Sequence, residues 1–173
     1  KGVSIQDVAT PADGPSAGWR DAEGFESEVI GERGRLFDVI VVGCASRPSA
    51  AGRDVLCEAA LFDSGRPVMV ASGETPRTLG ETVVVAWNGS TETARTIGLG
   101  MPFLLAAGRV VVLTIEGGTV AGPGGDEGAA HLGRNGVKAE ARTAQMEGRS
   151  TGQAMLEECQ AIALEDRRER LTM

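Results

Sequence analysis

Aromatic side chains, histidine and positive charge are all scarce in this chain of 173 residues. Tyrosine is absent and aromatic residues make up only 3% of the chain, which leaves few rings for stacking on nucleic-acid bases. The formal net charge is −7, because 17 lysines and arginines are outnumbered by 24 aspartates and glutamates. Because nucleic-acid binding depends on positive charge opposite the phosphates, the composition argues against a nucleic-acid partner.

Long apolar runs, metal-ligand spacings and paired cysteines are missing as well. No run approaches the roughly 18 residues that a membrane span needs, and no apolar leader opens the chain, so we expect no membrane segment and a cytoplasmic location. The single histidine, His131, excludes a histidine-rich metal site and disfavours a Ser–His–Asp triad. Cys44, Cys57 and Cys159 show no C-x-x-C spacing and are expected to be reduced thiols. The sequence therefore predicts neither a metal site nor a catalytic residue.

Short β-branched runs alternate with stretches of helical periodicity along most of the chain. The expected strands are residues 39–42, 67–70, 83–86, 110–115 and 137–142, with a further short strand near residues 2–8. The expected helices are residues 25–36, 49–63, 91–107, 129–134 and one opening at residue 150. This alternation predicts βαβ units, and hence an α/β fold with a parallel twisted sheet and helices on both faces.

Local patterns also predict burial and helix ends. Residues 39–42 and 83–86 are apolar throughout, so we expect both runs to be buried strands, with Val41 fully buried. Ser150-x-x-Gln153 is a capping-box signature. Residues 87–90 are expected to form a polar turn and residues 116–128 a loop. The apolar helix faces are expected at Phe25, Val29 and Leu36, and at Ala94, Ile97, Met101 and Leu104.

The order and spacing of these elements resemble the universal stress protein family. Residues 81–114, ETVVVAWNGSTETARTIGLGMPFLLAAGRVVVLT, resemble its opening β-α-β, with a strand, an Asp or Asn followed by Gly-Ser, and a helix. Residues 136–162 resemble its third strand and third helix. Residues 37–71, FDVIVVGCASRPSAAGRDVLCEAALFDSGRPVMVA, resemble the closing half of another such module. The resemblance implies the family's fold, which is like that of the adenine nucleotide alpha hydrolases.

A closing half that precedes an opening half is expected of a piece from a tandem two-module protein. The expected organisation is a closing half over residues 1–72, a linker over 73–80, an opening half over 81–163 and a solvated charged tail over 164–173. Two arrangements stay open. The chain forms two incomplete modules, through truncation, a frame shift or divergence, or it forms one permuted sheet of order 3-2-1-4-5. In the second, the strand at 39–42 pairs with the strand at 83–86 across a helix-free connection, which is unusual between parallel strands.

The resemblance implies a nucleotide site at the carboxyl ends of the strands, where parallel α/β sheets bind ligands. The candidate residues are Ala86, Asn88, Gly89, Ser90, Gly43 and Arg47. Asn88 stands where ATP-binding members usually present Asp, and its turn opens a helix, which suits an anion or an ordinary N-cap. The phosphate loop of ATP-binding members has glycine where this chain has Ser46, and Gly-Ser or Gly-Thr where it has Leu56 and Cys57. Side chains there would obstruct the approach of a phosphate.

The resemblance therefore implies a non-catalytic universal stress protein, with a regulatory or protective role in the stress response, that binds no ATP and needs no cofactor. An ATP-binding module with slow hydrolysis is the alternative. Family members pair through exposed edge strands, so a homodimer or pseudo-dimer is expected, and residues 67–70 offer such an edge. Cys44 near Arg47 is a candidate redox thiol or, more simply, a structural one.

Overall fold

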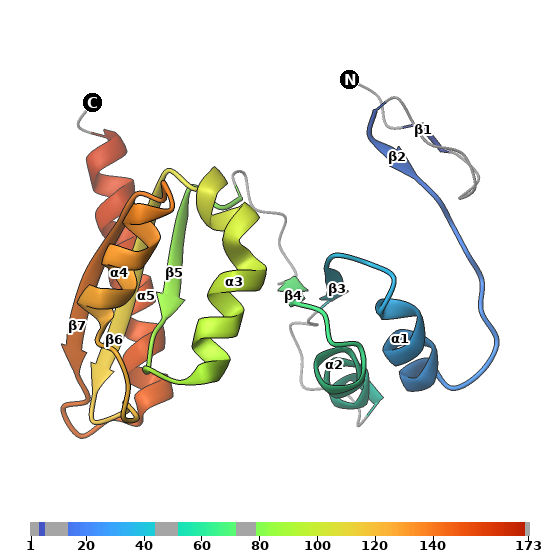
Figure 1. Cartoon of the computed structure of the whole chain (residues 1–173), viewed down its shortest axis with the longest axis horizontal. Helices are drawn as coiled ribbons and strands as arrows, with labels where there is room; N and C mark the ends of the chain where they lie inside the picture. Colours follow the sequence, from blue (N-terminus) through green and yellow to red (C-terminus); the bar gives the residue numbers. More distant parts are fainter. Residues whose placement is uncertain (1–3, 6–13, 44–51, 72–78, 172–173) are drawn as a thin grey trace. The chain divides into compact units, whose positions relative to one another are not determined.

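The computed structural model describes residues 4–5, 14–43, 52–71 and 79–171, which fall into two compact units, Lys1–Gly73 and Glu74–Met173 (Figure 1). The strands are β1 (Ser4–Ile5), β2 (Ser16–Ala17), β3 (Ile40–Gly43), β4 (Val68–Ala71), β5 (Thr82–Ala86), β6 (Arg109–Glu116) and β7 (Ala139–Gln145). The helices are α1 (Glu26–Gly34), α2 (Gly52–Asp63), α3 (Thr91–Ala106), α4 (Gly125–Arg134) and α5 (Thr151–Leu171). All described strand pairs are parallel, which confirms the predicted α/β class.

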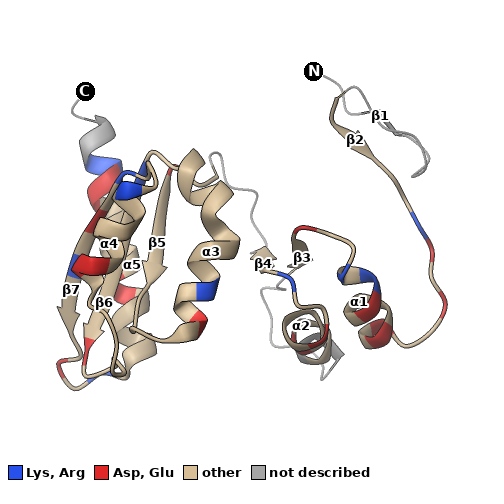
Figure 2. Ribbon diagram, in the orientation of Figure 1, with Lys and Arg blue, Asp and Glu red and all other residues tan. Residues whose placement is uncertain are grey.

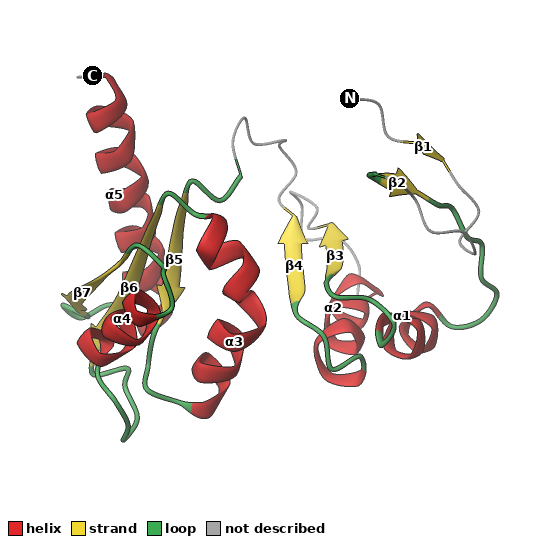
Figure 3. Cartoon of the chain, turned by 45° about the horizontal axis from the view of Figure 1, so that its top comes forward, coloured by secondary structure: helices red, strands yellow, loops and turns green. Residues whose placement is uncertain are grey.

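The second unit is a three-layer sandwich built on the sheet β5-β6-β7. Helices α3 and α4 pack on one face of this sheet and α5 on the other (Figure 3). The crossovers through α3 and α4 step in one direction across the sheet and share a face, as right-handed connections require.

Strand β6 is the centre of this unit, with side chains buried on both faces. Val110 and Val112 pack against α3 and α4, whereas Val111, Leu113 and Ile115 pack against α5. Burial on both faces explains why β6 needs a continuous apolar run rather than an alternating one. Among the described helices, none is long and apolar enough to cross a membrane.

Strand β5 is an edge strand rather than the buried strand that its sequence predicts. Its only neighbour among the described strands is β6. Val85 is buried, but Val83 and Val84 remain partly exposed. The prediction fails because an apolar run does not show how many neighbours a strand has. The described strands pair as β1-β2, β3-β4 and β5-β6-β7, so the permuted pairing of residues 39–42 with 83–86 is not among them.

The first unit contains the small sheets β1-β2 and β3-β4, and its helices α1 and α2 pack closely through glycine. Gly31 lies against Asp63 of α2, and Gly34 lies against the side chain of Ile40. Ile40 therefore points toward α1, whereas Val41 points to the opposite face and is 59% exposed. The prediction that Val41 is fully buried is wrong, because the two-stranded sheet has no described layer on that face.

Three of the predicted helix features are confirmed. The Ser90 hydroxyl accepts the N–H of Thr93 (3.3 Å) and caps α3. At the start of α5, Gln153 N–H donates to the Ser150 hydroxyl (3.3 Å) and Ser150 N–H donates to the Gln153 side chain (3.1 Å), which is the predicted capping box. On α3, three of the four predicted core positions contribute to the core, and the fourth is exposed. The three are Ile97, Met101 and Leu104, and the exposed one is Ala94.

Two other helix predictions are wrong. Helix α4 begins before the predicted residues 129–134, because the Glu127 carboxylate accepts the N–H of Gly124 (3.0 Å) and caps an earlier turn. Helix α1 is shorter than predicted, so Phe25 and Leu36 lie outside it and are exposed. In both cases the periodicity identified the helix but not its ends.

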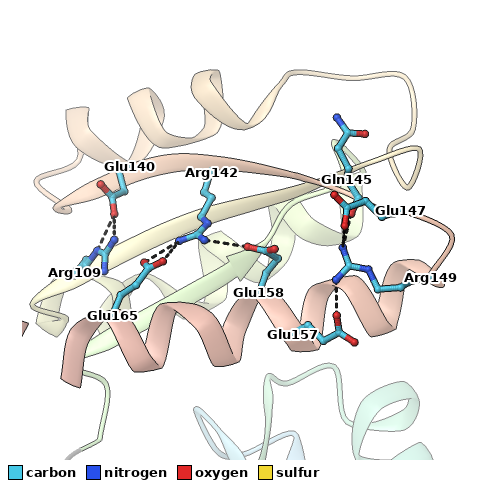
Figure 4. Close-up of polar contacts among 9 residues, drawn as sticks. All are labelled: Arg109, Glu140, Arg142, Gln145, Glu147, Arg149, Glu157, Glu158 and Glu165. Carbon is cyan, nitrogen blue, oxygen red and sulfur yellow. Dashed lines mark hydrogen bonds and ion pairs between the residues drawn. The ribbon is translucent and has the colours of Figure 1, made fainter. Parts of the chain in front are cut away.

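The segment expected to be a solvated tail instead continues α5 and contacts the sheet. Arg142 on β7 pairs with Glu165 (2.9 Å) and Glu158 (3.1 Å) of α5 (Figure 4). Arg109 on β6 pairs with Asp166 (2.6 Å). The hydrogen bond to Glu165 raises the pKa of the Arg142 guanidinium, because it stabilises the charged form. These pairs hold one flank of α5 against β7.

Replacing Arg142 by Gln should lower the free energy of unfolding by about 1 kcal/mol, a modest loss because the pairs are partly exposed and screened. Urea unfolding followed by circular dichroism, at low and high salt, measures the loss. Arg134→Gln is the matched control, because Arg134 is exposed at the end of α4 and forms no ion pair with the other described residues. An equal loss for both variants would contradict this account of α5.

Candidate functional site

Two loops meet at the carboxyl end of the sheet β5-β6-β7, the end at which parallel α/β sheets bind ligands. Val120 N–H, in the loop after β6, donates to the carbonyl oxygen of Asn88 in the turn after β5 (2.9 Å). Gly89 has a positive φ of 84°. A Cβ on Gly122 would clash with the carbonyl oxygen of Gly89. Glycine is therefore required at both positions for the loops to touch.

A cavity of about 290 Å³ opens beside these loops, between the starts of α3 and α5. Its lining residues are Ala86, Trp87, Asn88, Thr93, Ile115, Gly118, Thr151, Gly152 and Met155. The polar side chains in this lining are the amide of Asn88, the hydroxyls of Thr93 and Thr151, and the indole of Trp87. None of the lining residues is charged. Its volume is at the lower limit of ordinary small-molecule sites. The cavity is suited to a small neutral group.

Asn88 holds the turn after β5 in place. Its side-chain oxygen accepts the N–H of Ser90 (3.0 Å) and the hydroxyl of Thr93 (3.3 Å). The Ser90 hydroxyl accepts a further N–H from the first turn of α3. Side chains of this turn therefore already occupy some of the backbone donors that could bind an anion at the start of α3.

The structure brings together only some of the predicted site residues. Ala86 and Asn88 line the cavity, and Gly89 and Ser90 form the turn that supports it. Gly43 ends β3 in the first unit. Outside the described residues lie Arg47, Ser46 and Cys44.

Two hydroxyls in the cavity lining were not among the residues predicted from the sequence. Thr93 stands in the first turn of α3, after β5, and Thr151 opens α5, after β7. A residue at the start of a helix that follows a parallel strand lies at the carboxyl edge of the sheet. The positions of these two hydroxyls could therefore have been predicted from the sequence. The lining positions Ile115, Gly118 and Met155 carry no comparable signal.

Trp87 belongs to the core and not to the polar turn that was predicted. Its ring is buried between the sheet and the helices α3 and α4, and its indole N–H donates to the carbonyl oxygen of Pro123 (2.9 Å). Trp87 also lines a second hollow, of about 370 Å³, between α3 and α4. The ionisable residues around that hollow are Glu127, His131 and Arg134. His131 is exposed.

Two further side chains lie outside the cavity lining. Burial, with a smaller effect from Glu158, raises the pKa of the Cys159 thiol, so at neutral pH it stays protonated and is a weak nucleophile. The Thr114 hydroxyl is buried against Gly125 and has no hydrogen-bond partner among the described residues.

Metal-ligand side chains do not cluster in the part of the chain that the structure describes. These residues contain no group of three His, Cys, Asp or Glu side chains that could hold a metal ion.

The fold and the cavity define the class of this protein as a parallel α/β protein with a ligand-sized hollow at the carboxyl end of its sheet. No family model matches the chain, and neither a curated protein nor a solved structure matches it.

Proposed function

We propose that this chain functions as a universal stress protein, in a non-catalytic regulatory or protective role, and that it does not depend on ATP. The family assignment rests on the resemblance of residues 37–71 and 81–114. The observation that supports the independence of ATP is the neutral lining of the cavity after β5. A triphosphate is bound by cationic side chains or by free backbone N–H groups. Here the lining has no cation, and Asn88 and Ser90 occupy donors at the start of α3.

An ATP-binding module with slow hydrolysis is the second candidate. It is favoured by the position of the turn at Asn88, which opens a helix at the ligand-binding edge of a parallel sheet. Against it stand Ser46, Leu56 and Cys57, which replace the glycines and hydroxyl of the phosphate loop in the family that the chain resembles.

Titration calorimetry with ATP should detect no one-to-one complex tighter than about 100 μM, which corresponds to roughly −5.5 kcal/mol. Adenosine is the control ligand for ATP, because it lacks the triphosphate and reports binding of the nucleoside alone to the neutral cavity. Ser46→Gly should not create ATP binding, since Leu56 and Cys57 would still replace the second part of the loop. A tighter ATP complex that adenosine does not reproduce would favour the second candidate.

The same proposal includes a cytoplasmic location and self-association through edge strands. Fractionation of cells that express the full-length protein tests the location, and the protein should be recovered with cytoplasmic markers. The mass in solution tests self-association, and we expect the copies to pair at an exposed edge such as residues 67–70.

A further inference from the structure

The hollow between α3 and α4 is a second site of ligand size in this unit. Its volume of about 370 Å³ falls within the range of ordinary small-molecule sites. Trp87 is the one described residue that lines both this hollow and the cavity at the carboxyl end of the sheet. The other lining residues come from α3, from α4 and from the loop before α4, so the two sites have different walls.

The apolar wall of the hollow is a core position of α3 that nothing covers among the described residues. Ala94 stands about one turn before Ile97 on the same helix face, yet Ile97 is buried and Ala94 is exposed. On the α4 side, a Cβ on Gly128 would lie 3.6 Å from two ring carbons of Trp87, so the glycine packs directly on the indole. Figure 2 shows that the charged residues of α3 lie at its beginning, and none of them lines the hollow. An apolar group placed here would complete the core.

Helix α4 provides the ionisable side chains of the hollow. Glu127, His131 and Arg134 stand at positions i, i+4 and i+7, which places them on one flank of the helix. The Glu127 carboxylate accepts the N–H of Gly124 (3.0 Å) and is thereby held at the beginning of α4. Arg134 stands about 10 Å further along the helix axis, at 1.5 Å per residue. The negative and positive charges therefore lie toward opposite ends of the hollow.

The Arg134 guanidinium is not used by the fold in the part of the chain that the structure describes. It forms no ion pair or hydrogen bond there, whereas Arg142 is held by two carboxylates. It is also not needed to cap α4, because the carbonyl oxygens of His131, Leu132 and Gly133 accept hydrogen bonds from residues 135–137. Helix side chains lean toward the N-terminus of their helix, so Arg134 leans toward His131 and the hollow that both line.

We infer that the hollow between α3 and α4 binds a small organic carboxylate with an apolar body. The body lies against Ala94 and Trp87, and the carboxylate binds the guanidinium of Arg134 in the bidentate geometry that this pair favours. His131 is three residues from Arg134 and supplies a second N–H donor to the same carboxylate. A carboxylate fits better than an ammonium ion, because Arg134 has no partner among the described residues whereas Glu127 already has one. The inference rests on a site other than the one that supports the proposed function, and it is independent of that function.

Fluorescence titration of the full chain with 3-phenylpropionate tests the inference. The chain has two tryptophans, and Trp19 is exposed in the first unit, so Trp19→Phe leaves Trp87 in the hollow as the remaining reporter. The probe should give a saturable change in Trp87 fluorescence with a Kd of about 1 mM or tighter. Two control ligands divide its chemistry: 3-phenyl-1-propanol keeps the ring without the charge, and propionate keeps the charge without the ring. Each should bind at least about tenfold more weakly than the probe, because each lacks one of the two contacts.

Two variants of the same protein assign the binding to this hollow. Ala94→Phe fills it and should abolish binding of the probe. Ala106→Phe is the matched control, since Ala106 is exposed near the other end of α3, about 18 Å along the helix axis, and it should keep the original affinity. Arg134→Gln should weaken the probe at least about tenfold and leave the affinity for 3-phenyl-1-propanol unchanged, a difference that a merely structural role would not produce.

The circular dichroism spectrum of each variant should be unchanged, because all three side chains are exposed. Arg134→Gln keeps the test decisive even if Ala94→Phe disturbs the packing of α3. Absence of saturable binding, equal affinity for the probe and the alcohol, or an unchanged affinity for the probe in Arg134→Gln would each overturn the inference. Unchanged affinity in a folded Ala94→Phe would overturn it as well. None of these results depends on ATP binding.

Discussion

Val112→Asp should abolish the cooperative folding of the second unit. Val112 has no exposed surface and lies on the central strand β6, between the sheet and the helices α3 and α4. A carboxylate placed there would have no charged or hydrogen-bonding partner within the core. The cost of several kcal/mol is comparable with the whole net stability of a small domain, about 5–15 kcal/mol.

Val41→Asp is the matched comparison for this prediction. The substitution is chemically identical and also falls on a β-strand, but Val41 is 59% exposed in its own unit. We expect it to change the free energy of unfolding by less than about 1 kcal/mol. Urea unfolding followed by circular dichroism distinguishes the two variants. Equal destabilisation by both would show that β3 is as buried as β6, and would contradict the burial described above.

Gly122→Ala should separate the two loops beside the cavity and destabilise the second unit by about 1–3 kcal/mol. The reason is steric, because the new methyl group would clash with the backbone oxygen of Gly89, and a backbone atom cannot turn away as a flexible side chain can. The hydrogen bond from Val120 to Asn88, which joins the same loops, would be lost with it.

Gly98→Ala is the control, and it should have the opposite sign. Gly98 is exposed on α3 and a Cβ there would meet no atom within 4 Å. Alanine in a helix interior is favoured over glycine by about 1 kcal/mol, so this variant should be more stable than the wild type. Thermal unfolding of the two variants side by side measures both effects. A neutral Gly122→Ala would mean that the loops are not held as closely as the structure indicates.

Much of the fold follows from local patterns that act over a few residues. The alternation of β-branched runs with helical periodicity predicted the parallel α/β class. The hydroxyls of Ser90 and Ser150 marked two helix starts correctly, because a cap depends only on neighbouring backbone groups. The same is true of Ile97 and Leu104, whose spacing on one helix face does not depend on the rest of the chain.

The cavity could be predicted only in part. Ala86 and Asn88 were found because they follow a strand in the sequence, and the turn there has a recognisable composition. Thr93 and Thr151 come from two different helices, and they line one cavity because β5, β6 and β7 are parallel and end at the same edge. Residues that are far apart in the chain are joined by strand pairing, which no local pattern contains.

The sequence by itself determined the order and type of the elements in this protein, and the tertiary structure decided which of them are central. Residues 83–86 and 110–115 are equally apolar runs, yet β5 is an edge strand and β6 is buried on both faces. The charged end of α5 likewise resembles a solvated tail in its sequence, but Glu165 in this segment pairs with Arg142 on the distant strand β7. The physical reason is common to both cases: periodicity reports which way a side chain points, whereas burial and charge pairing depend on which other elements come to lie against it.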